Sequence, residues 1–411
     1  MTLPVVLVVG GAGSASPMEV ADAAAGLCRP LFAYRRSDPS VSTRLIELFE
    51  LLGPAVDLDD AGDLRRLGAR GIVSFSDAGI GQAAAIAEEL CLEYHSSAAA
   101  TALTDKSVQR AVLAAAGAES VRHARVSSSA DVGPALRSVG VPAVVKPVSG
   151  SGSRDTYPVS DVPAGSALLR ELLADRPGTA YIVEEQLSGD TSVAGPAWGD
   201  YVSVETLVTG GHPRPLAVTG RLPLEAPYRE TGFFVPATLR PETVSAAAEL
   251  AHRAIRALGV TSGLVHTELK LTATGPRVIE VNGRLGGFVA PLLRRAAGVD
   301  PVRLALAAAL GTATPRTLSY SCVAFQRLVL PRAGAVRVAG IRGVEDLGRV
   351  PGVEQVRISA LPGAEVDWRA GYHGNLGLVA GAVEDHGQLS ATLDEITRVL
   401  RVEYVYRAEV G

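Results

Sequence analysis

Cysteine is scarce in this chain of 411 residues. Only Cys28, Cys91 and Cys322 are present, and no two of them form a Cys-x-x-Cys pair. An odd number of widely spaced cysteines provides neither a disulfide framework nor a thiolate metal site, and it fits a reducing compartment. We therefore expect a cytoplasmic protein that is stabilised by its hydrophobic core.

Long apolar runs and an excess of basic charge are also missing. No segment approaches the about 20 apolar residues that a membrane-spanning helix requires. The apolar start, residues 3–9, has no basic leader and runs directly into glycines, which predicts a buried strand and not a signal peptide. A formal net charge of −4 gives no basic field for nucleic acid. We expect no binding of nucleic acid or membranes, and small molecules as partners.

Lysine is almost absent from the chain. Of 39 basic residues only Lys106, Lys146 and Lys270 are lysines, and the others are arginines. The two side chains differ most where a compact ammonium must reach a phosphate in a narrow site, because a guanidinium is a wide planar fork. Codon bias is the alternative explanation. Taken together, the contexts of the three lysines favour a functional reason over codon bias.

The N-terminal part shows a repeated strand, loop and helix pattern. The run VVLVVGGAG (5–13) precedes a helical pattern at 18–26, and GIVSFSD (71–77) precedes a second one. This alternation predicts a small Rossmann-like α/β lobe over residues 1–101. The loop GGAGS, with Arg35 and Arg36 further on, raises the alternative of a dinucleotide site for a nicotinamide oxidoreductase. Because the loop does not match GxGxxG, we favour a simple chain turn.

Two lysines lie in contexts suited to phosphate. Thr104 is the expected cap of a helix over 104–117, which puts Lys106 in its first turn. The run VPAVVKP predicts a buried strand that carries Lys146 and is followed by a glycine-rich loop. Backbone N–H groups of such a loop can approach phosphate oxygens while lysines neutralise their charge. The loop consists of Ser149, Gly150, Ser151, Gly152 and Ser153.

Two further strands carry polar residues in alternation. Residues two apart in a strand share a face, so Glu268 points with Lys270, and Glu280 points with Asn282 and Arg284. If the strands pair, two carboxylates and an amide oxygen meet, a ligand set that suits Mg²⁺ beside phosphates. The alternative is a solvated polar face. We predict that Glu268, Glu280 and Asn282 bind magnesium.

In this order the motifs resemble the ATP-grasp superfamily over about residues 102–310, and most closely its L-amino-acid ligases and carboxylate-amine ligases. The resemblance implies that Lys106 and Lys146 bind the phosphates of ATP. It also implies that Arg284 is catalytic and stabilises the acyl phosphate; a structural ion pair with Glu280 is the alternative for this arginine. Further nucleotide contacts implied by the resemblance come from the side chain of Glu184, the backbone of Glu185 and Leu187, and Asp190 at the ribose.

Substrate recognition is expected from four residues. Arg221 and Glu230 lie in a polar, proline-containing segment where the carboxylate and amine of an amino acid can be recognised, and an ordinary solvated loop is the alternative. His266 shares the face of Glu268 and either borders the substrate or is a core histidine. We also expect Gly286, in the segment GRLGG, at the substrate.

The resemblance implies an α/β protein, of α+β type in its ATP-grasp part, which is an ATP- and Mg²⁺-dependent ligase forming amide bonds through an acyl phosphate. A carboxylase acting on a separate carrier and a non-catalytic nucleotide-binding protein are the alternatives. The expected lobes are 1–101, 102–188 with the glycine-rich loop, 189–318 with the metal and substrate sites, and a C-terminal α/β part, 319–411. That last part carries no motif, and we expect it to cover the site or to form a homodimer contact.

Overall fold

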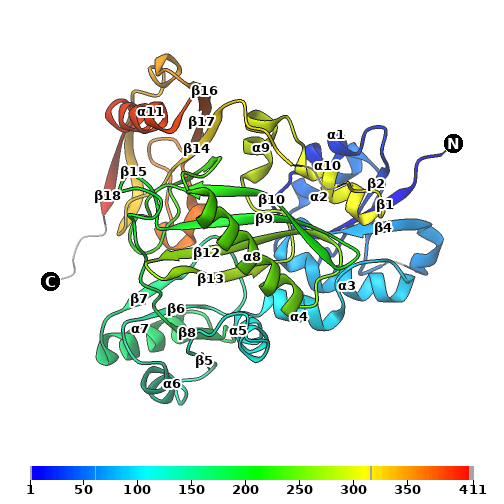
Figure 1. The fold of residues 1–411 in the computed structure, drawn as a ribbon, viewed down its shortest axis with the longest axis horizontal. Coiled ribbons are helices and arrows are strands. Elements are labelled where there is room, and N and C mark those ends of the chain that lie inside the picture. Colours follow the sequence, from blue (N-terminus) through cyan, green and yellow to red (C-terminus); the bar gives the residue numbers. More distant parts are fainter. Residues whose placement is uncertain (1, 61, 315–316, 407–411) are drawn as a thin grey trace.

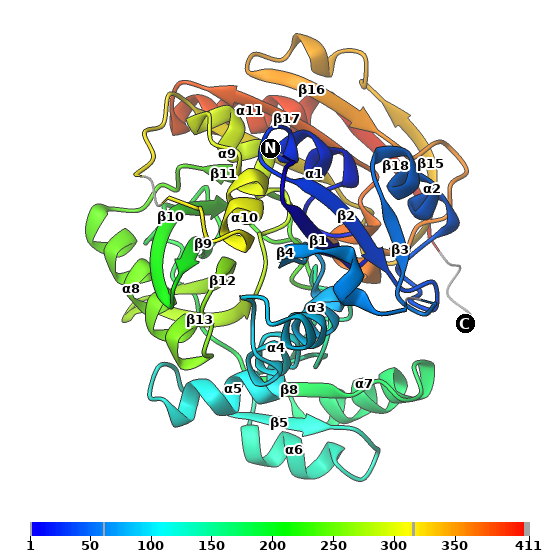
Figure 2. The same ribbon diagram turned by 90° about the vertical axis from the view of Figure 1, so that its right-hand side faces the viewer.

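The computed structural model describes residues 2–60, 62–314 and 317–406, which build four β-sheets with their helices (Figures 1 and 2). The sheets belong to an N-terminal lobe, a small antiparallel lobe and a large central sheet, with a short two-stranded sheet near the C-terminus. Within the described ranges no helix has both the length and the apolar character that crossing a membrane would require. The α/β prediction is confirmed.

The N-terminal lobe has an all-parallel sheet in the order β3-β2-β1-β4. All five residues of the first strand, VVLVV, are buried, as their β-branched character predicts. The expected strand and helix alternation is therefore present. The elements are β1 (Val5–Val9), α1 (Pro17–Ala24), β2 (Arg29–Tyr34), α2 (Thr43–Leu52), β3 (Ala55–Asp57), β4 (Ala69–Val73) and α3 (Asp77–Leu90).

Helices α4 (Ser97–Thr104) and α5 (Lys106–Ala115) lead from this lobe to the next. The expected cap, Thr104, is the last residue of α4, and its hydroxyl donates to the carbonyl of Ala100. Asp105 caps α5 instead, because its carboxylate accepts hydrogen bonds from the N–H groups of Ser107 and Val108. The prediction of the cap was wrong by one residue, while Lys106 begins the helix as expected.

The small lobe is a four-stranded antiparallel sheet in the order β5-β8-β6-β7. It places Lys146 on β6 beside Ile182 of β8, two residues before Glu184. The elements are β5 (His123–Val126), α6 (Val132–Val139), β6 (Ala143–Pro147), β7 (Tyr157–Val159), α7 (Val162–Asp175) and β8 (Tyr181–Glu185).

The central sheet has eight strands in the order β13-β12-β9-β10-β11-β14-β17-β16. Helix α8 (Pro241–Ala257) crosses one face, as Figure 1 shows, and packs its buried alanines against the sheet. The strands are β9 (Tyr201–Thr209), β10 (His212–Arg221), β11 (Gly232–Val235), β12 (Gly263–Thr272), β13 (Gly275–Asn282), β14 (Val323–Val329), β16 (Val353–Ile358) and β17 (Gly377–Val383).

The C-terminal part continues the central sheet. Strand β14 pairs with β11, and β17 and β16 follow it outward, so the sheet runs across the expected boundary at residue 318. The remaining elements are α9 (Val289–Ala297), α10 (Pro301–Ala309), β15 (Ala335–Arg342), the short 3-10 helix η3 (Trp368–Gly374), α11 (His386–Val399) and β18 (Arg401–Tyr406).

Candidate active site

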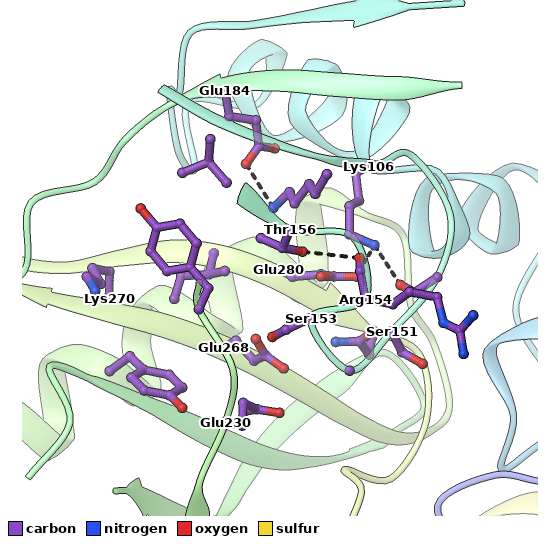
Figure 3. A pocket seen from close by; sticks show the side chains of 18 of the residues that line it. Lys106, Ser151, Ser153, Arg154, Thr156, Glu184, Glu230, Glu268, Lys270 and Glu280 are labelled. Atoms are coloured by element: carbon purple, nitrogen blue, oxygen red, sulfur yellow. Dashed lines mark hydrogen bonds and ion pairs between the residues drawn. The ribbon is translucent and has the colours of Figure 1, made fainter. Parts of the chain in front are cut away.

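The register of β12 and β13 brings the acidic side chains together. Glu268 lies directly opposite Glu280, and His266 lies opposite Asn282. Figure 3 shows Glu268 and Glu280 near the loop residues Ser151 and Ser153. Among the described residues no group of three or more histidine, cysteine, aspartate or glutamate side chains is arranged around a metal position. The predicted metal ligands, Glu268, Glu280 and Asn282, provide two carboxylates and one amide. This combination fits a cation that also binds oxygens of phosphate and water.

Lys106 connects the glycine-rich loop to this pair of strands. Its ammonium donates to the carbonyl of Gly150 at 2.7 Å and lies 3.0 Å from Glu280 Oε1. The backbone N–H of Lys106 donates to the carbonyl of Val148, just before the loop. The ammonium is thus buried between the loop and an acidic strand, where a phosphate would meet its charge.

Lys146 is held by a buried carboxylate. Its ammonium lies 2.8 Å from Glu184 Oε2, and Arg110 of α5 donates to the same carboxylate from Nε at 2.8 Å. Burial alone would raise the pKa of Glu184, but Arg110 and Lys146 outweigh it and lower this pKa well below its usual range. Arg110 also donates to the carbonyls of Val278 and Ile279, which ties the small lobe to β13.

The glycine-rich loop is in contact with the C-terminal part of the chain. The N–H of Tyr372 donates to the carbonyl of Gly152 at 3.1 Å, and the N–H of Asp155 donates to the carbonyl of Arg369. A Cβ atom on Gly371 would lie 1.7 Å from the carbonyl oxygen of Gly152, so only glycine fits this approach. The 3-10 helix η3 therefore covers the loop directly.

A buried pair lies beside the acidic residues, between the neighbouring strands β12 and β9. Glu205 of β9 accepts a hydrogen bond from His266 Nδ1 at 2.6 Å. Burial lowers the pKa of His266, but Glu205 outweighs it, and the pKa is raised to about 9. Gly286 supports this pair, because its N–H donates to Glu205 and a Cβ atom there would lie 2.3 Å from the imidazole.

Arg221 is a buried cation with free hydrogen-bonding capacity. It is 2% exposed, and its guanidinium lies 4.5 Å from the ring centre of Phe233 and 5.7 Å from that of Tyr201. Its Nη1 is 3.8 Å from Glu230, too far for a hydrogen bond, and its Nε and Nη1 are buried without a hydrogen-bond partner among the described residues. Burial, opposed by Arg221 and reinforced by Glu268, raises the pKa of Glu230 to about 7. Such unsatisfied groups at a cavity wall are suited to a polar ligand.

Arg284 follows β13 and pairs with the N-terminal lobe. Its Nη2 lies 2.6 Å from Asp77 Oδ2, and its Nη1 donates to the carbonyl of Leu285. Burial lowers the pKa of Arg284, but Asp77 outweighs it and the pKa is raised, so the guanidinium stays charged. The expected alternative partner of this arginine was Glu280. The ion pair is formed with Asp77 instead.

Comparison with known proteins identifies the fold family of this site. Residues 139–291 match a family described as "ATP-grasp domain". This part of the chain is an ATP-grasp domain. An L-amino acid ligase from Bacillus licheniformis has the same fold, with a TM-score of 0.78 at 20% identity over 98% of this chain and 100% of that one.

Two curated relatives are similar in sequence to this ATP-grasp protein. "Uncharacterized protein y4rH" of Sinorhizobium fredii is 31% identical over 281 residues, which are 67% of this chain and 56% of the relative. "Alanine--anticapsin ligase" of Bacillus subtilis is 26% identical over 253 residues, 58% of this chain and 53% of the relative. The chain thus spans little more than half the length of these relatives.

One cavity collects nearly all of the residues that the sequence indicated. Asp190 is not brought to it, because its carboxylate accepts hydrogen bonds from the N–H and hydroxyl of Ser192. Gly286 lies behind His266, and Gly287 lines the cavity instead. The predicted residues that do line it are Lys106, Lys146, Ser149, Gly150, Ser151, Gly152, Ser153, Glu184, Glu185, Leu187, Arg221, Glu230, His266, Glu268, Glu280, Asn282 and Arg284.

Three residues of this ATP-grasp site were not predicted from the sequence. Arg110 lies four positions after Lys106 on α5, a spacing that puts both on one helix face and was a usable signal. Asp77 follows β4, the last strand of the parallel sheet in the sequence. It therefore lies at the carboxyl edge of the sheet, where parallel sheets commonly place functional groups. Tyr372 lies about 90 residues after the end of β13, and no local sequence pattern indicates a role for it.

Proposed function

We propose that this chain is an ATP-dependent ligase that activates a carboxylate as an acyl phosphate and joins it to an amine, with release of ADP and phosphate. The observation that carries the proposal is the pairing of Glu268 with Glu280, with Asn282 next to them and Lys106 3.0 Å from Glu280. This arrangement puts hard oxygen ligands and a compact cation at one point. Phosphoryl transfer depends mainly on such positioning and charge compensation.

The nucleotide is expected between the small lobe and β13. Lys106, Lys146 and the N–H groups of the glycine-rich loop are suited to its phosphates, and Val144 and Ile279 give apolar walls for a base. The N–H of Glu185 already donates to the carbonyl of Arg122, so the carbonyl of Glu185 and the backbone of Leu187 are the candidates for adenine. Glu184 acts through Lys146, whose ammonium it orients.

Glu268, Glu280 and Asn282 would hold Mg²⁺, which supplies charge compensation for the phosphates when it is bound. Without a cation the two facing carboxylates and the phosphates would repel one another. Lys106 relieves part of this repulsion at Glu280.

The substrates are expected on the side of Arg221 and Glu230. Their buried and incompletely paired charges fit the carboxylate and the ammonium of an amino acid. The names of an L-amino acid ligase and an alanine–anticapsin ligase among the similar proteins support amino acids as substrates. Arg284 is suited to stabilise the acyl phosphate and the oxyanion that forms when the amine attacks. The covered loop excludes water, which would otherwise hydrolyse the mixed anhydride.

The test is incubation of the protein with Mg·ATP and pairs of amino acids, with phosphate release and product mass as readouts. We expect phosphate release that requires both substrates and a product whose mass corresponds to a dipeptide. A panel with bicarbonate tests for a carboxylase. Tight ATP binding without turnover on any pair would instead indicate a non-catalytic nucleotide-binding protein.

A further inference from the structure

The contact between Asp77 and Arg284 crosses from the N-terminal lobe to the active site. We propose that Asp77 is a positioning residue that directs Arg284 toward the reacting groups, and that the glycine loop GGAGS holds Asp77 in place. The inference rests on the proposed ligase function, in which Arg284 touches the acyl phosphate. It gives the N-terminal lobe a part in the reaction.

Asp77 is placed at the start of a helix but does not serve as its cap. The residue before it, Ser76, occupies the cap position of α3 and makes no side-chain capping bond. Asp77 Oδ2 binds Arg284 at 2.6 Å, and Asp77 Oδ1 is buried without a hydrogen-bond partner among the described residues. A carboxylate that served only the helix would face the N–H groups of the first turn. This one is directed to the arginine.

The glycine loop of the N-terminal lobe packs against the turn that carries Asp77. The N–H of Ser14 donates to the carbonyl of Phe75 at 2.7 Å, and the hydroxyl of Ser14 donates to the same oxygen at 3.1 Å. A Cβ atom on Gly13 would lie 2.0 Å from that oxygen, so the approach requires glycine. The glycines therefore have a structural reason that does not involve a dinucleotide. Arg35 and Arg36, the other part of that alternative, pair with Asp59 and Asp57.

The same lobe also holds the backbone beside Arg284. His95 Nε2 lies 2.9 Å from the carbonyl oxygen of Gly283, and both are buried. Figure 2 shows α3 directly above α4, which follows His95, so both contacts come from one region of the fold. Backbone and side chain at 283–284 are thus fixed from the N-terminal lobe.

The alternative partners of Arg284 explain why positioning is needed. The charge of Glu280 acts on the pKa of Arg284, and the charge of Arg284 acts on the pKa of Glu268. Without Asp77 the guanidinium would be attracted to these carboxylates, where it would compete with Mg²⁺. In the structure Arg284 is instead paired with Asp77, 2.6 Å from its Nη2.

The test compares Asp77→Asn and Asp77→Glu with the wild type in the amino-acid ligation assay. We expect Asp77→Asn to lower kcat by about tenfold or more. Removal of an oxyanion donor itself lowers kcat by ~10² to 10³, and misplacing Arg284 should cause part of that loss. The KM for ATP should stay within about twofold, since the nucleotide is bound by other residues. Asp77→Glu keeps the charge and should recover part of the rate. Glu19→Gln is the control, because Glu19 also joins the N-terminal lobe to an arginine, Arg294 at 2.8 Å, but away from the cavity.

A double mutant separates positioning from general support of the fold. In an Arg284→Ala background, Asp77→Asn should cause no further loss, because the residue acts through Arg284. Additive losses, or an unchanged kcat in Asp77→Asn, would overturn the inference and leave the ligase function intact.

A binding measurement covers the case in which no amino-acid pair is turned over. The protein loaded with Mg·ADP is titrated with inorganic phosphate in a calorimeter. We expect phosphate affinity to fall in both Arg284→Ala and Asp77→Asn and to be kept in Glu19→Gln. That result would support the positioning role even if the ligase function fails, whereas equal phosphate affinity in Asp77→Asn and wild type, or none in either, would contradict it.

Discussion

Lys146 and Arg110 bind the same buried carboxylate, that of Glu184, and share its Oε2, which lies 2.8 Å from the ammonium of Lys146 and 3.1 Å from Nη2 of Arg110. Glu184 thereby holds the ammonium of Lys146 at the cavity wall, and it can do so without contacting ATP itself. The guanidinium of Arg110 also donates from Nε to Oε1 at 2.8 Å, so it already binds both oxygens of Glu184. This leaves room for a compact cation only.

We predict that Lys146→Arg lowers turnover at least about tenfold although it keeps the charge, because a second planar guanidinium does not fit beside Arg110. The measurement is the rate of phosphate release under saturating Mg·ATP. Lys270→Arg provides the comparison, since Lys270 pairs with the less buried Asp200 at 2.7 Å and should tolerate the change better. A near wild-type rate for Lys146→Arg would favour codon bias as the reason for the few lysines.

Glu184→Gln should destabilise the protein in a pH-dependent manner. At pH 7 we expect a loss of about 3 kcal/mol or more in the free energy of unfolding, because two buried cations lose their counter-charge. Since the pKa of Glu184 is lowered in the folded state, its stabilisation is complete above the ordinary value of 4.5 and is lost as the pH falls below it. The difference between wild type and variant should therefore shrink by about 1.4 kcal/mol per pH unit below 4.5.

Urea unfolding between pH 7 and pH 3.5 measures this difference. Glu185→Gln is the control, because Glu185 pairs with the exposed Arg122 and such pairs contribute less than about 1 kcal/mol. A difference for Glu184→Gln that stays constant over the whole pH range would show that its carboxylate has an ordinary pKa.

Arg284→Ala and Glu280→Ala should separate catalysis from nucleotide binding. Loss of Arg284 should leave Mg·ATP affinity nearly unchanged and reduce amide formation by ~10² to 10³. Loss of Glu280 removes a proposed metal ligand and the partner of Lys106, so affinity and rate should fall together. Calorimetric titration with a non-hydrolysable ATP analogue measures the affinities. Equal loss of nucleotide binding in both variants would show that Arg284 supports the metal site and is not a catalytic donor.

The products should be ADP and inorganic phosphate. Both lysines, the loop and the acidic strands surround the position expected for the terminal phosphates, so the γ-phosphoryl group is the one activated. Chromatography of the nucleotides after reaction measures the outcome. Amine-dependent formation of AMP would require a different mechanism.

Most of the site follows from local sequence patterns. The alternation in β12 and β13 predicted that Glu268 and Glu280 would meet if the strands paired, and the observed register confirms it. The lysine contexts and the glycine-rich loop were also predictable, since strand period and helix start are set within a few residues. The order of these motifs along the chain carries the resemblance to ATP-grasp proteins.

The contacts that were missed are long-range. Asp77 meets Arg284 across 207 positions, and Tyr372 reaches Gly152 from a segment without any motif. Neither partner is specified by the residues around the other, because the contact exists only after separate sheets have packed. Asp190 shows the reverse case. Its carboxylate lies near a motif in the sequence but accepts a hydrogen bond from Ser192, two positions further on.

The pairing of β11 with β14 and the contact of Tyr372 with Gly152 mean that the C-terminal part cannot be exchanged between related proteins as an independent module. A chimera joined at residue 318 would present β11 with a foreign neighbour and would replace Tyr372 of the cavity lining together with the segment that rests on the glycine-rich loop. The protein that supplies the last 90 or so residues would then influence how nucleotide enters and leaves, although it brings none of the proposed phosphate or metal ligands.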